Sequence, residues 1–412
     1  MSKNYLSFGK VLTDCSPDAT GEIIIPDDVV IIHENAFSGC DLIESVVIPD
    51  SVEEIRAEAF YMCSNLKSIK FGNGLKMIGT LAFSECDSLE SIVIPASVEY
   101  IHHLAFYACV SLESIVVDPK NKLYDSRDNC NAIIDTYRNK LIIGCASSSI
   151  PEGVTTIGED AFMGCSALVG IGIPDSVTSI GDSAFQYCEY LDEIRIPKSV
   201  ATIGNWAFED CTSLAEVVIS NGVTRIGERA FCSCTSLISI VIPESVTSIG
   251  DYAFDDCESL ESIVVDSNNK VYDSRNNCNA IIHTKSNVLI AGCKNSIIPQ
   301  GVTGIGDGAF GSCSSLTEVV IPESVTKIGK EAFYGCSSLT EIVIPESVTK
   351  IGKYAFYDCS SLAEIVIPDG VTEIGDSAFG GCSSLKKVSI PERFKEREAK
   401  IFREHTAEIT YY

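Results

Sequence analysis

The chain has 412 residues, of which 45% are hydrophobic and 21% are charged, and its formal net charge is -27 at pH 7. This composition excludes a disordered or fibrous chain, and the acidic surface excludes nucleic acid and anionic membranes as partners because both would be repelled. No stretch approaches the ~18 uninterrupted apolar residues of a transmembrane helix, and the opening MSKNYLSFGK lacks the features of a secretory signal. We therefore expect no membrane insertion.

The first predicted element is an N-terminal cap over residues 1–22, ahead of the first clean IIIP segment. From residue 23 to residue 390 one unit recurs, marked by the dipeptide Ala-Phe. The step is 23 residues within three groups and 56 residues between groups. The marker phenylalanines are Phe37, Phe60, Phe83, Phe106, Phe162, Phe185, Phe208, Phe231, Phe254, Phe310, Phe333, Phe356 and Phe379.

A full unit, residues 321–343, reads IPESVTKIGKEAFYGCSSLTEIV. Its Leu-x-x-Ile-x-Ile stretch has the period of two expected of a short strand, and the following proline ends that strand. The glycine marks a second bend, and Ala-Phe-x-x-Cys is short enough for one tight helical turn. Each unit is thus predicted to be one coil with a strand on one side.

One such unit cannot fold alone. Burying its apolar side chains yields on the order of 10–20 kcal/mol, whereas ordering the backbone costs roughly 1–2 kcal/mol for each residue. The units must therefore stack, and the chain is predicted to be an α/β-type repeat solenoid that is mainly β.

Two insertions interrupt the repeat, near residues 118–150 and 266–298, and their similarity creates a higher period of 148 residues. In the first, Cys130 and Cys145 flank a segment whose midpoint falls between Tyr137 and Arg138; Cys278 and Cys293 flank the second copy in the same way. If the segment is a hairpin, these cysteines form a cross-strand pair that an oxidising compartment would join. The alternative, which the register favours, places Cys145 and Cys293 in the leucine slot of the next coil.

The last predicted element is a C-terminal cap over residues 391–412. Phe402 keeps the 23-residue step after Phe379, but Ile401 takes the alanine slot and His405 takes the cysteine slot. The segment FKEREAKIFREH is charged and typical of a helix. A terminal coil needs such a change because it has only one neighbour.

The repeated motif IP-x-S-V-T-x-IG-x-x-AF-x-x-C-x-S-L-x-x-I resembles the BspA-like leucine-rich repeats. The resemblance covers about residues 23–391. It implies a curved, right-handed leucine-rich-repeat superhelix with a parallel concave sheet, and no enzymatic activity. It also implies adhesion through a protein ligand such as a host or extracellular matrix protein, and a cell-surface or secreted location. This chain shows no signal or anchor, so a cytoplasmic location stays open.

Thirteen of the nineteen cysteines occupy one slot, three residues after the repeat phenylalanine. One cysteine in each coil predicts a structural column of small buried side chains, since a zinc site needs clustered ligands that this spacing does not supply. The column is Cys40, Cys63, Cys86, Cys109, Cys165, Cys188, Cys211, Cys234, Cys257, Cys313, Cys336, Cys359 and Cys382.

The residue between the two isoleucines of each strand is expected to point outward, onto the concave sheet. Nine of thirteen such positions are valine, edged by serine and glutamate two residues earlier. An apolar stripe of this kind is typical of a protein-binding surface, although valine also suits any exposed strand. The candidate stripe is Val47, Val93, Val116, Val218, Val241, Val264, Val320, Val343 and Val366.

No set of convergent polar groups breaks the repeat, so we expect no catalytic residues, no metal site and no cofactor. His33 and His102 occupy glycine slots three coils apart, too far to share a metal. The run GIGDG at 304–308 resembles a nucleotide-binding loop only superficially, because no strand-to-helix unit follows. Calcium is a weaker alternative at the insertion residues Asp118, Asn121, Asp125, Asp128, Asp266, Asn269 and Asp273.

The sequence thus predicts a non-enzymatic protein-binding or adhesion module. Two alternatives stay open: a self-assembling scaffold in which the stripe packs on another copy, and a ligand- or calcium-binding protein that uses the insertions. The partner and the oligomeric state cannot be read from the sequence.

Overall fold

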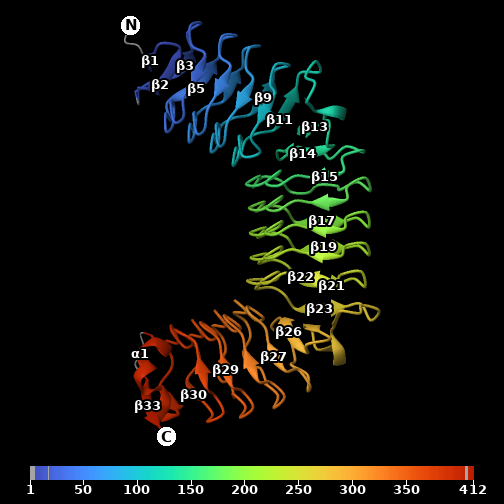
Figure 1. Ribbon diagram of the computed structural model, residues 1–412, viewed down its shortest axis with the longest axis vertical. Helices are drawn as coiled ribbons and strands as arrows, with labels where there is room; N and C mark the ends of the chain where they lie inside the picture. The colour runs from blue at the N-terminus through green and yellow to red at the C-terminus, as the bar shows by residue number, and fades with distance from the viewer. Residues whose placement is uncertain (1–4, 17, 404–406) are drawn as a thin grey trace. The chain divides into compact units, whose positions relative to one another are not determined.

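The computed structural model describes residues 5–16, 18–403 and 407–412. The chain is a mainly-β solenoid with parallel sheets, and it divides into two compact units, residues 1–212 and 213–412. Within each unit the coils follow one another in chain order (Figure 1). Among the described residues, no helix is both long and apolar enough to cross a membrane.

In the first unit each regular coil contributes a short two-residue strand and a longer strand to two different sheets. The short ladder begins with β1 (Tyr5–Phe8) and β2 (Val11–Cys15) and continues through β4 (Ile31–Ile32), β6 (Glu54–Ile55), β8 (Met77–Ile78) and β10 (Tyr100–Ile101). The longer strands are β3 (Gly21–Ile24), β5 (Ile43–Val47), β7 (Ser68–Lys70), β9 (Ser91–Ile94) and β11 (Ser114–Val117).

The first insertion forms the predicted hairpin and then returns to the solenoid. Its strands β13 and β14 are antiparallel, with Asp135 opposite Lys140, so the turn centres on Tyr137 and Arg138. The elements are β12 (Tyr124–Asp125), η1 (Arg127–Asn129), β13 (Ile133–Asp135) and β14 (Lys140–Ile143), followed by β15 (Thr156–Ile157), β16 (Ser179–Ile180), β17 (Glu193–Ile196) and β18 (Thr202–Ile203).

The second unit repeats this plan. It begins with β19 (Glu216–Ile219), β20 (Arg225–Ile226), β21 (Ser239–Ile242), β22 (Ser248–Ile249) and β23 (Ser262–Val265). The second insertion holds β24 (Tyr272–Asp273), η2 (Arg275–Asn277), β25 (Ile281–His283) and β26 (Val288–Ala291). The remaining elements are β27 (Gly304–Ile305), β28 (Lys327–Ile328), β29 (Lys350–Ile351), β30 (Glu364–Val366), β31 (Glu373–Ile374), β32 (Lys387–Ile390), η3 (Glu392–Arg397), α1 (Glu398–Ile401) and β33 (Glu408–Tyr411).

The expectation of a helical turn at Ala-Phe-x-x-Cys is wrong. In the coil of Phe60, the flanking residues Glu58 and Met62 have left-handed φ angles of 56° and 57°. These angles turn the Phe60 amide toward the next coil, where it donates to the Ala82 carbonyl oxygen at 2.8 Å. The segment is therefore a tight turn: it keeps internal bonds such as that from the Cys63 amide to the Phe60 carbonyl at 3.4 Å, and it adds a third ladder of hydrogen bonds between coils.

The core of each unit is built on stacked phenylalanine rings. Phe60 and Phe83 lie nearly parallel with their centroids 5.0 Å apart, and Phe310 and Phe333 do the same at 5.1 Å. Such offset stacking adds about 0.5–1.5 kcal/mol for each pair beyond the burial of the rings. The stack therefore accounts for the strict placement of phenylalanine in every coil.

A glycine of each insertion stands at the start of the next phenylalanine stack. The Gly292 amide donates to the Ala309 carbonyl at 2.7 Å, which is the bond that a repeat phenylalanine makes in a regular coil. A Cβ atom on Gly292 would lie 2.3 Å from the Phe310 ring, and one on Gly144 would lie 2.1 Å from the Phe162 ring. Only glycine lets the hairpin backbone pack directly on the exposed ring face.

The two end segments differ from the regular coils, and we retain the proposal that they act as caps. At the N-terminal end, β1 and β2 pair antiparallel before the parallel ladder begins. At the C-terminal end, β33 pairs parallel with β32, and Phe402 stacks on Phe379 with centroids 5.3 Å apart. His405 lies outside the described residues.

Candidate protein-binding surface

The valine positions project outward because the strands alternate. In β21, Ile240 and Ile242 are buried, whereas Ser239 and Val241 are exposed. The same alternation holds in β9, which carries Val93. Period-two alternation in a half-buried strand thus places the residue between the two isoleucines, which is valine in most coils, on the surface.

Neighbouring valines lie directly opposite one another. Val93 pairs in register with Val116 in the first unit, and Val241 pairs in register with Val264 in the second. Each unit therefore carries a short apolar column on the face of its longer strands. Of the nine predicted valines, Val47 and Val218 are half-buried and the other seven are exposed, namely Val93, Val116, Val241, Val264, Val320, Val343 and Val366.

Just beyond the second insertion, at Val320 and Val343, the valine column loses its strands and becomes more exposed. Residues 318–321 and 341–344 belong to no strand among the described residues, although their sequences match the repeat. Val320 and Val343 are 82% and 79% exposed, compared with 57% for Val93 and 42% for Val116 in paired strands. Here the valine side chains have lost the cover of neighbouring strands, so more apolar surface faces solvent than the repeat requires.

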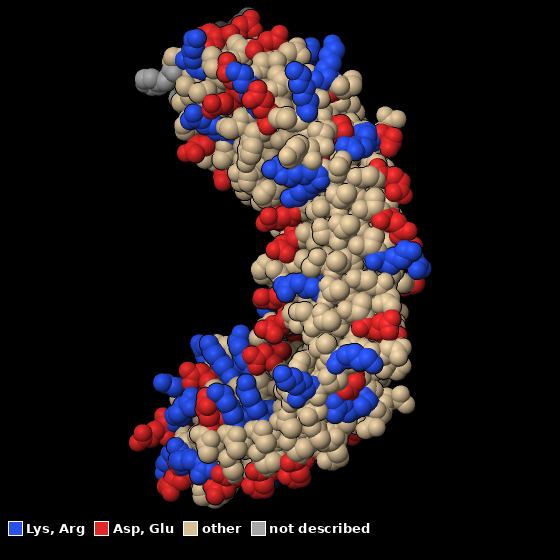
Figure 2. Space-filling view, turned by 45° about the vertical axis from the view of Figure 1, so that its right-hand side comes forward, with Lys and Arg blue, Asp and Glu red and all other residues tan. Residues whose placement is uncertain are grey.

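Two grooves open beside these unpaired segments. One, of about 450 Å³, lies between Val343 and Val366, and the other, of about 490 Å³, lies beside Val320. The first groove is lined by Ile342, Ile344, Pro345 and Pro368 on its apolar side, and its rim holds Glu323, Glu341, Glu346 and Glu364. Figure 2 shows wide uncharged areas between groups of charged side chains on the face that it presents.

We call the surface formed by Val320, Val343, Val366 and these glutamates the acidic valine groove. Its floor is apolar and its rim is negative, which suits a partner that carries alternating apolar and basic side chains. The sequence indicated the valine column but not the groove. The groove arises where the strand ladder is interrupted, and nothing in the repeat motif records that interruption.

The cysteine column has a direct structural contact. Most thiols of the column donate a hydrogen bond to the backbone carbonyl of the phenylalanine 26 residues earlier, in the preceding coil. For example, Cys63 Sγ lies 3.1 Å from the Phe37 oxygen. Eight further cysteines, namely Cys86, Cys109, Cys188, Cys211, Cys257, Cys336, Cys359 and Cys382, make the same bond at 3.0–3.2 Å.

After each insertion the acceptor changes. Cys165 faces the Gly144 carbonyl at 3.6 Å, and Cys313 faces the Gly292 carbonyl at 4.0 Å. A hydrogen bond with Cys15 lowers the pKa of Cys40. Burial raises the pKa of most other thiols in the column, to about 12 for Cys109 and Cys382. These thiols are thus held protonated, a form that neither attacks an electrophile nor binds a metal.

The hairpin cysteines are free thiols. Cys130 and Cys145 are buried and lie outside the paired strands β13 and β14. Cys145 Sγ contacts the Asn131 carbonyl oxygen at 3.4 Å, and Cys130 Sγ contacts that of Ala132 at 3.8 Å. Their contacts are therefore with backbone carbonyls.

The polar residues of the insertions are occupied by local contacts. Asp125 pairs with Arg127 at 2.8 Å, and Asp273 pairs with Arg275 at 2.6 Å. The Asn121 side-chain oxygen accepts from the Leu123 and Tyr124 amides at 2.9 and 3.0 Å. These are the Asx contacts of tight turns. These turn contacts explain why Asp and Asn occur at positions that the calcium alternative proposed as ligands.

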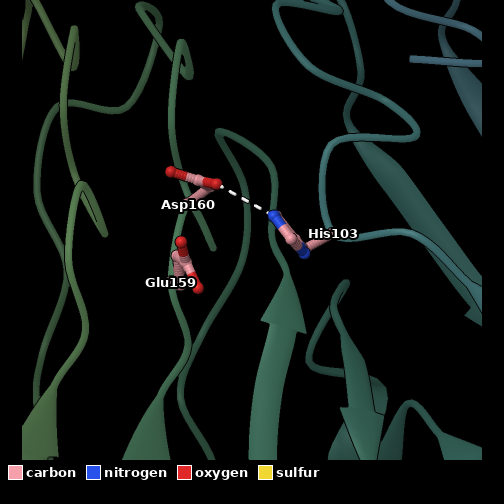
Figure 3. A group of neighbouring side chains, drawn as sticks. All are labelled: His103, Glu159 and Asp160. Atoms are coloured by element: carbon pink, nitrogen blue, oxygen red, sulfur yellow. Dashed lines mark ion pairs between the residues drawn. The ribbon is translucent and has the colours of Figure 1, made fainter. Parts of the chain in front are cut away.

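The sequence analysis did not identify one group of neighbouring ionisable side chains. His103 Nε2 lies 3.1 Å from Asp160 Oδ2, with Glu159 beside them (Figure 3). Their ligand atoms lie within 4.8 Å of one another, and the insertion has brought together residues more than 50 positions apart. Direct contact between the imidazole and the carboxylate makes this an ion pair between coils, and it accounts for the geometry without a metal ion.

The stacked coils, the phenylalanine and cysteine columns and the outward valines define a repeat protein of the solenoid type. The chain matches the family described as BspA type leucine rich repeat region over residues 16–131, 142–281 and 290–408, and it belongs to this family. No match was found among curated proteins.

Solved structures agree with the fold. A leucine-rich cell surface protein from Faecalibacterium prausnitzii is 28% identical with a TM-score of 0.59, and the match covers 97% of this chain and 90% of that protein. A leucine-rich repeat protein from Bacteroides ovatus is 27% identical with a TM-score of 0.47, covering 98% and 94% of the two chains. The pneumococcal vaccine antigen PcpA is 19% identical with a TM-score of 0.50, covering 93% and 78%.

Proposed function

We propose that this protein is a non-enzymatic binding module that captures a protein partner through the acidic valine groove. The observation that carries the proposal is the exposure of Val320 and Val343, 82% and 79%, beside a groove of about 450 Å³ with a glutamate rim. Contiguous exposed apolar surface rimmed by polar residues is typical of an interaction site. The similarity to a cell surface protein supports an adhesive role.

The chemistry of the groove specifies the kind of partner. An extended segment places alternate side chains on one face, so apolar side chains would contact Val343 and Val366 while basic ones reach Glu341 and Glu364. A second copy of the same surface is disfavoured, because its glutamates would face glutamates. We therefore expect an extended apolar and basic segment of another protein.

A displayed library of random twelve-residue peptides tests the proposal on the full chain. We expect the selected peptides to alternate apolar residues with Lys or Arg. Their binding should weaken at least tenfold in the double variant Val320→Lys/Val343→Lys, because lysine removes the apolar floor and repels the basic side chains. Raising the salt concentration should weaken binding to the unaltered protein, because exposed charge pairs are screened.

The control is Ser315→Lys/Ser384→Lys, which adds the same charge at two exposed positions outside the groove. Unchanged thermal unfolding of both variants would show that the fold survives. Equal peptide binding by the two double variants would refute the groove as the site. Self-association that the valine variant abolishes would favour the scaffold alternative.

A further inference from the structure

A further cavity, separate from the two grooves, lies in the unit of residues 213–412, on the side of the Ala-Phe turns. The second insertion removes the regular neighbour of the coil that carries Asp255, and a coil 56 residues further on takes its place. Gly308 then packs against the Tyr252 ring and Gly311 against the Asp255 carboxylate; a Cβ on Gly311 would lie 1.8 Å from Asp255 Oδ1. The cavity has a volume of about 470 Å³.

The cavity wall is acidic. Asp255, Asp256 and Glu331 line it together with a single guanidinium, that of Arg229. Lys330 Nζ lies 3.2 Å from Glu331 Oε1 and adds a second cation beside the cavity, so three carboxyl groups against two cations leave a net negative charge when all are ionised. Asp255 Oδ1 is buried and has no hydrogen-bond partner among the described residues. Such an atom is costly unless a bound donor or a proton satisfies it.

Ionisation of Asp255 is opposed by its surroundings. Burial and the neighbouring Asp256 and Glu331 together raise its pKa to about 7, against the lowering effect of Arg229. A cation in the cavity would reverse this balance, because it favours the ionised carboxylates.

The other wall is aromatic. Tyr334 and Tyr357 stack at 5.6 Å, and Tyr354 meets Tyr357 edge-on at 5.4 Å. Lys353 Nζ already lies 4.6 Å from the centroid of the Tyr354 ring. Within the described part of the chain, Tyr334 and Tyr357 carry no such cation. Tyrosine rings beside carboxylates are a favourable setting for an organic cation.

The internal repeat offers a comparison. The residues 148 positions earlier are Tyr107 for Asp255, Ala108 for Asp256, Gln186 for Tyr334 and Glu209 for Tyr357. There the Gln186 amide donates to the Glu209 carboxylate at 2.5 Å, so these two side chains satisfy each other. The tyrosines and acids of the cavity are thus not requirements of the repeat, and a fold-preserving replacement exists for each of them.

From this arrangement we propose that the cavity binds an alkyl primary ammonium group, with the carboxylate of Asp256 and that of Glu331, which also pairs with Lys330, accepting its hydrogen bonds and the rings of Tyr334 and Tyr357 covering its alkyl chain. Primary ammonium has three donors and no acceptor, which matches an acceptor-rich wall. Two sources supply this group, a lysine side chain of a protein and a free diamine.

Isothermal titration of the full chain with Nα-acetyl-lysine-N-methylamide and with 1,5-diaminopentane tests the proposal. We expect saturable binding of at least one ligand and none of the norleucine analogue, which lacks the ammonium group. Tighter binding of the lysine derivative would assign the site to a protein side chain, and tighter binding of the diamine to a free amine. The absence of binding by both ligands would overturn the proposal.

Two variants copy the internal repeat. Asp256→Ala and Tyr334→Gln should each weaken binding at least tenfold. Alanine is compatible with the backbone at position 256, because Asp256 has a φ of 58° and the alanine at the corresponding position, Ala108, has a φ of 55°. The control Glu258→Gln removes an exposed acid of the same coil outside the cavity and should bind normally. Equal binding by all three variants, with unchanged thermal unfolding, would also overturn the proposal.

Discussion

The Cys211 thiol donates a hydrogen bond of 3.1 Å to the backbone carbonyl of Phe185, and so joins one coil to the coil before it. The same pair of positions recurs along the chain. The phenylalanine supplies a buried ring, and the cysteine donates a hydrogen bond to the backbone carbonyl of that phenylalanine. The Phe185 carbonyl also accepts from the Cys188 amide of its own turn at 3.2 Å, and its oxygen has room for a second donor. The cysteine supplies such a donor in a small apolar form.

Replacing Cys211 by alanine should therefore lower the free energy of unfolding by about 1–2 kcal/mol, through the lost hydrogen bond and the small cavity. Trp206, the single tryptophan of the chain, lies in the same coil and reports its unfolding by fluorescence during urea titration. Cys211→Ser keeps a donor and should lose less. An alanine variant as stable as the unaltered protein would show that the thiol serves packing alone.

Gly292 is predicted to tolerate no side chain. Gly292→Ala should destabilise the second unit by about 2 kcal/mol, because the new methyl group would stand 2.3 Å from the Phe310 ring and force the hairpin away from the stack. Gly301→Ala separates steric clash from backbone strain. Its Cβ atom would meet open space, but alanine at a φ of 90° strains the backbone. Urea unfolding followed by circular dichroism measures both, and a neutral Gly292→Ala would contradict the close packing.

Asp255 is predicted to make stability fall as the pH rises. Its folded-state pKa, raised to about 7 by burial and by Asp256, exceeds the ordinary carboxyl value near 4. The protonated group therefore contributes stability that is fully present below pH 4 and is lost as the pH rises through 7. Asp255→Asn should add about 2 kcal/mol at pH 8 and almost nothing at pH 4. Thermal unfolding across this range measures the difference, and a pH-independent effect would contradict it.

Phe402 is predicted to hold the last coil. Its ring covers Phe379 at 5.3 Å and is fully buried. Phe402→Ala should cost about 3 kcal/mol locally and expose the face of Phe379. Hydrogen exchange should then accelerate in residues 392–402 and leave the coils of the first unit unchanged. Uniform acceleration along the chain would instead indicate that the solenoid unfolds as one cooperative body.

The sequence by itself determined the coil length and the three columns of phenylalanine, cysteine and valine, and it offered a hairpin centred between Tyr137 and Arg138 as one of two alternatives. These follow from spacing, because a stacked repeat places equal positions above one another and a strand exposes every second residue. The expected helical turn was wrong because residues with left-handed φ angles, such as Glu58 and Met62, direct amides of the turn to the next coil, an arrangement that only a neighbouring coil makes possible.

Only the tertiary structure decided what happens where the stacking is interrupted. There the His103–Asp160 pair forms, the strands beside Val320 and Val343 lose their ladder, and Asp255 meets Gly311. Spacing within one chain predicts which residues stack in regular coils. It does not predict which coil an insertion brings alongside, because that contact is set by packing between segments more than 50 residues apart.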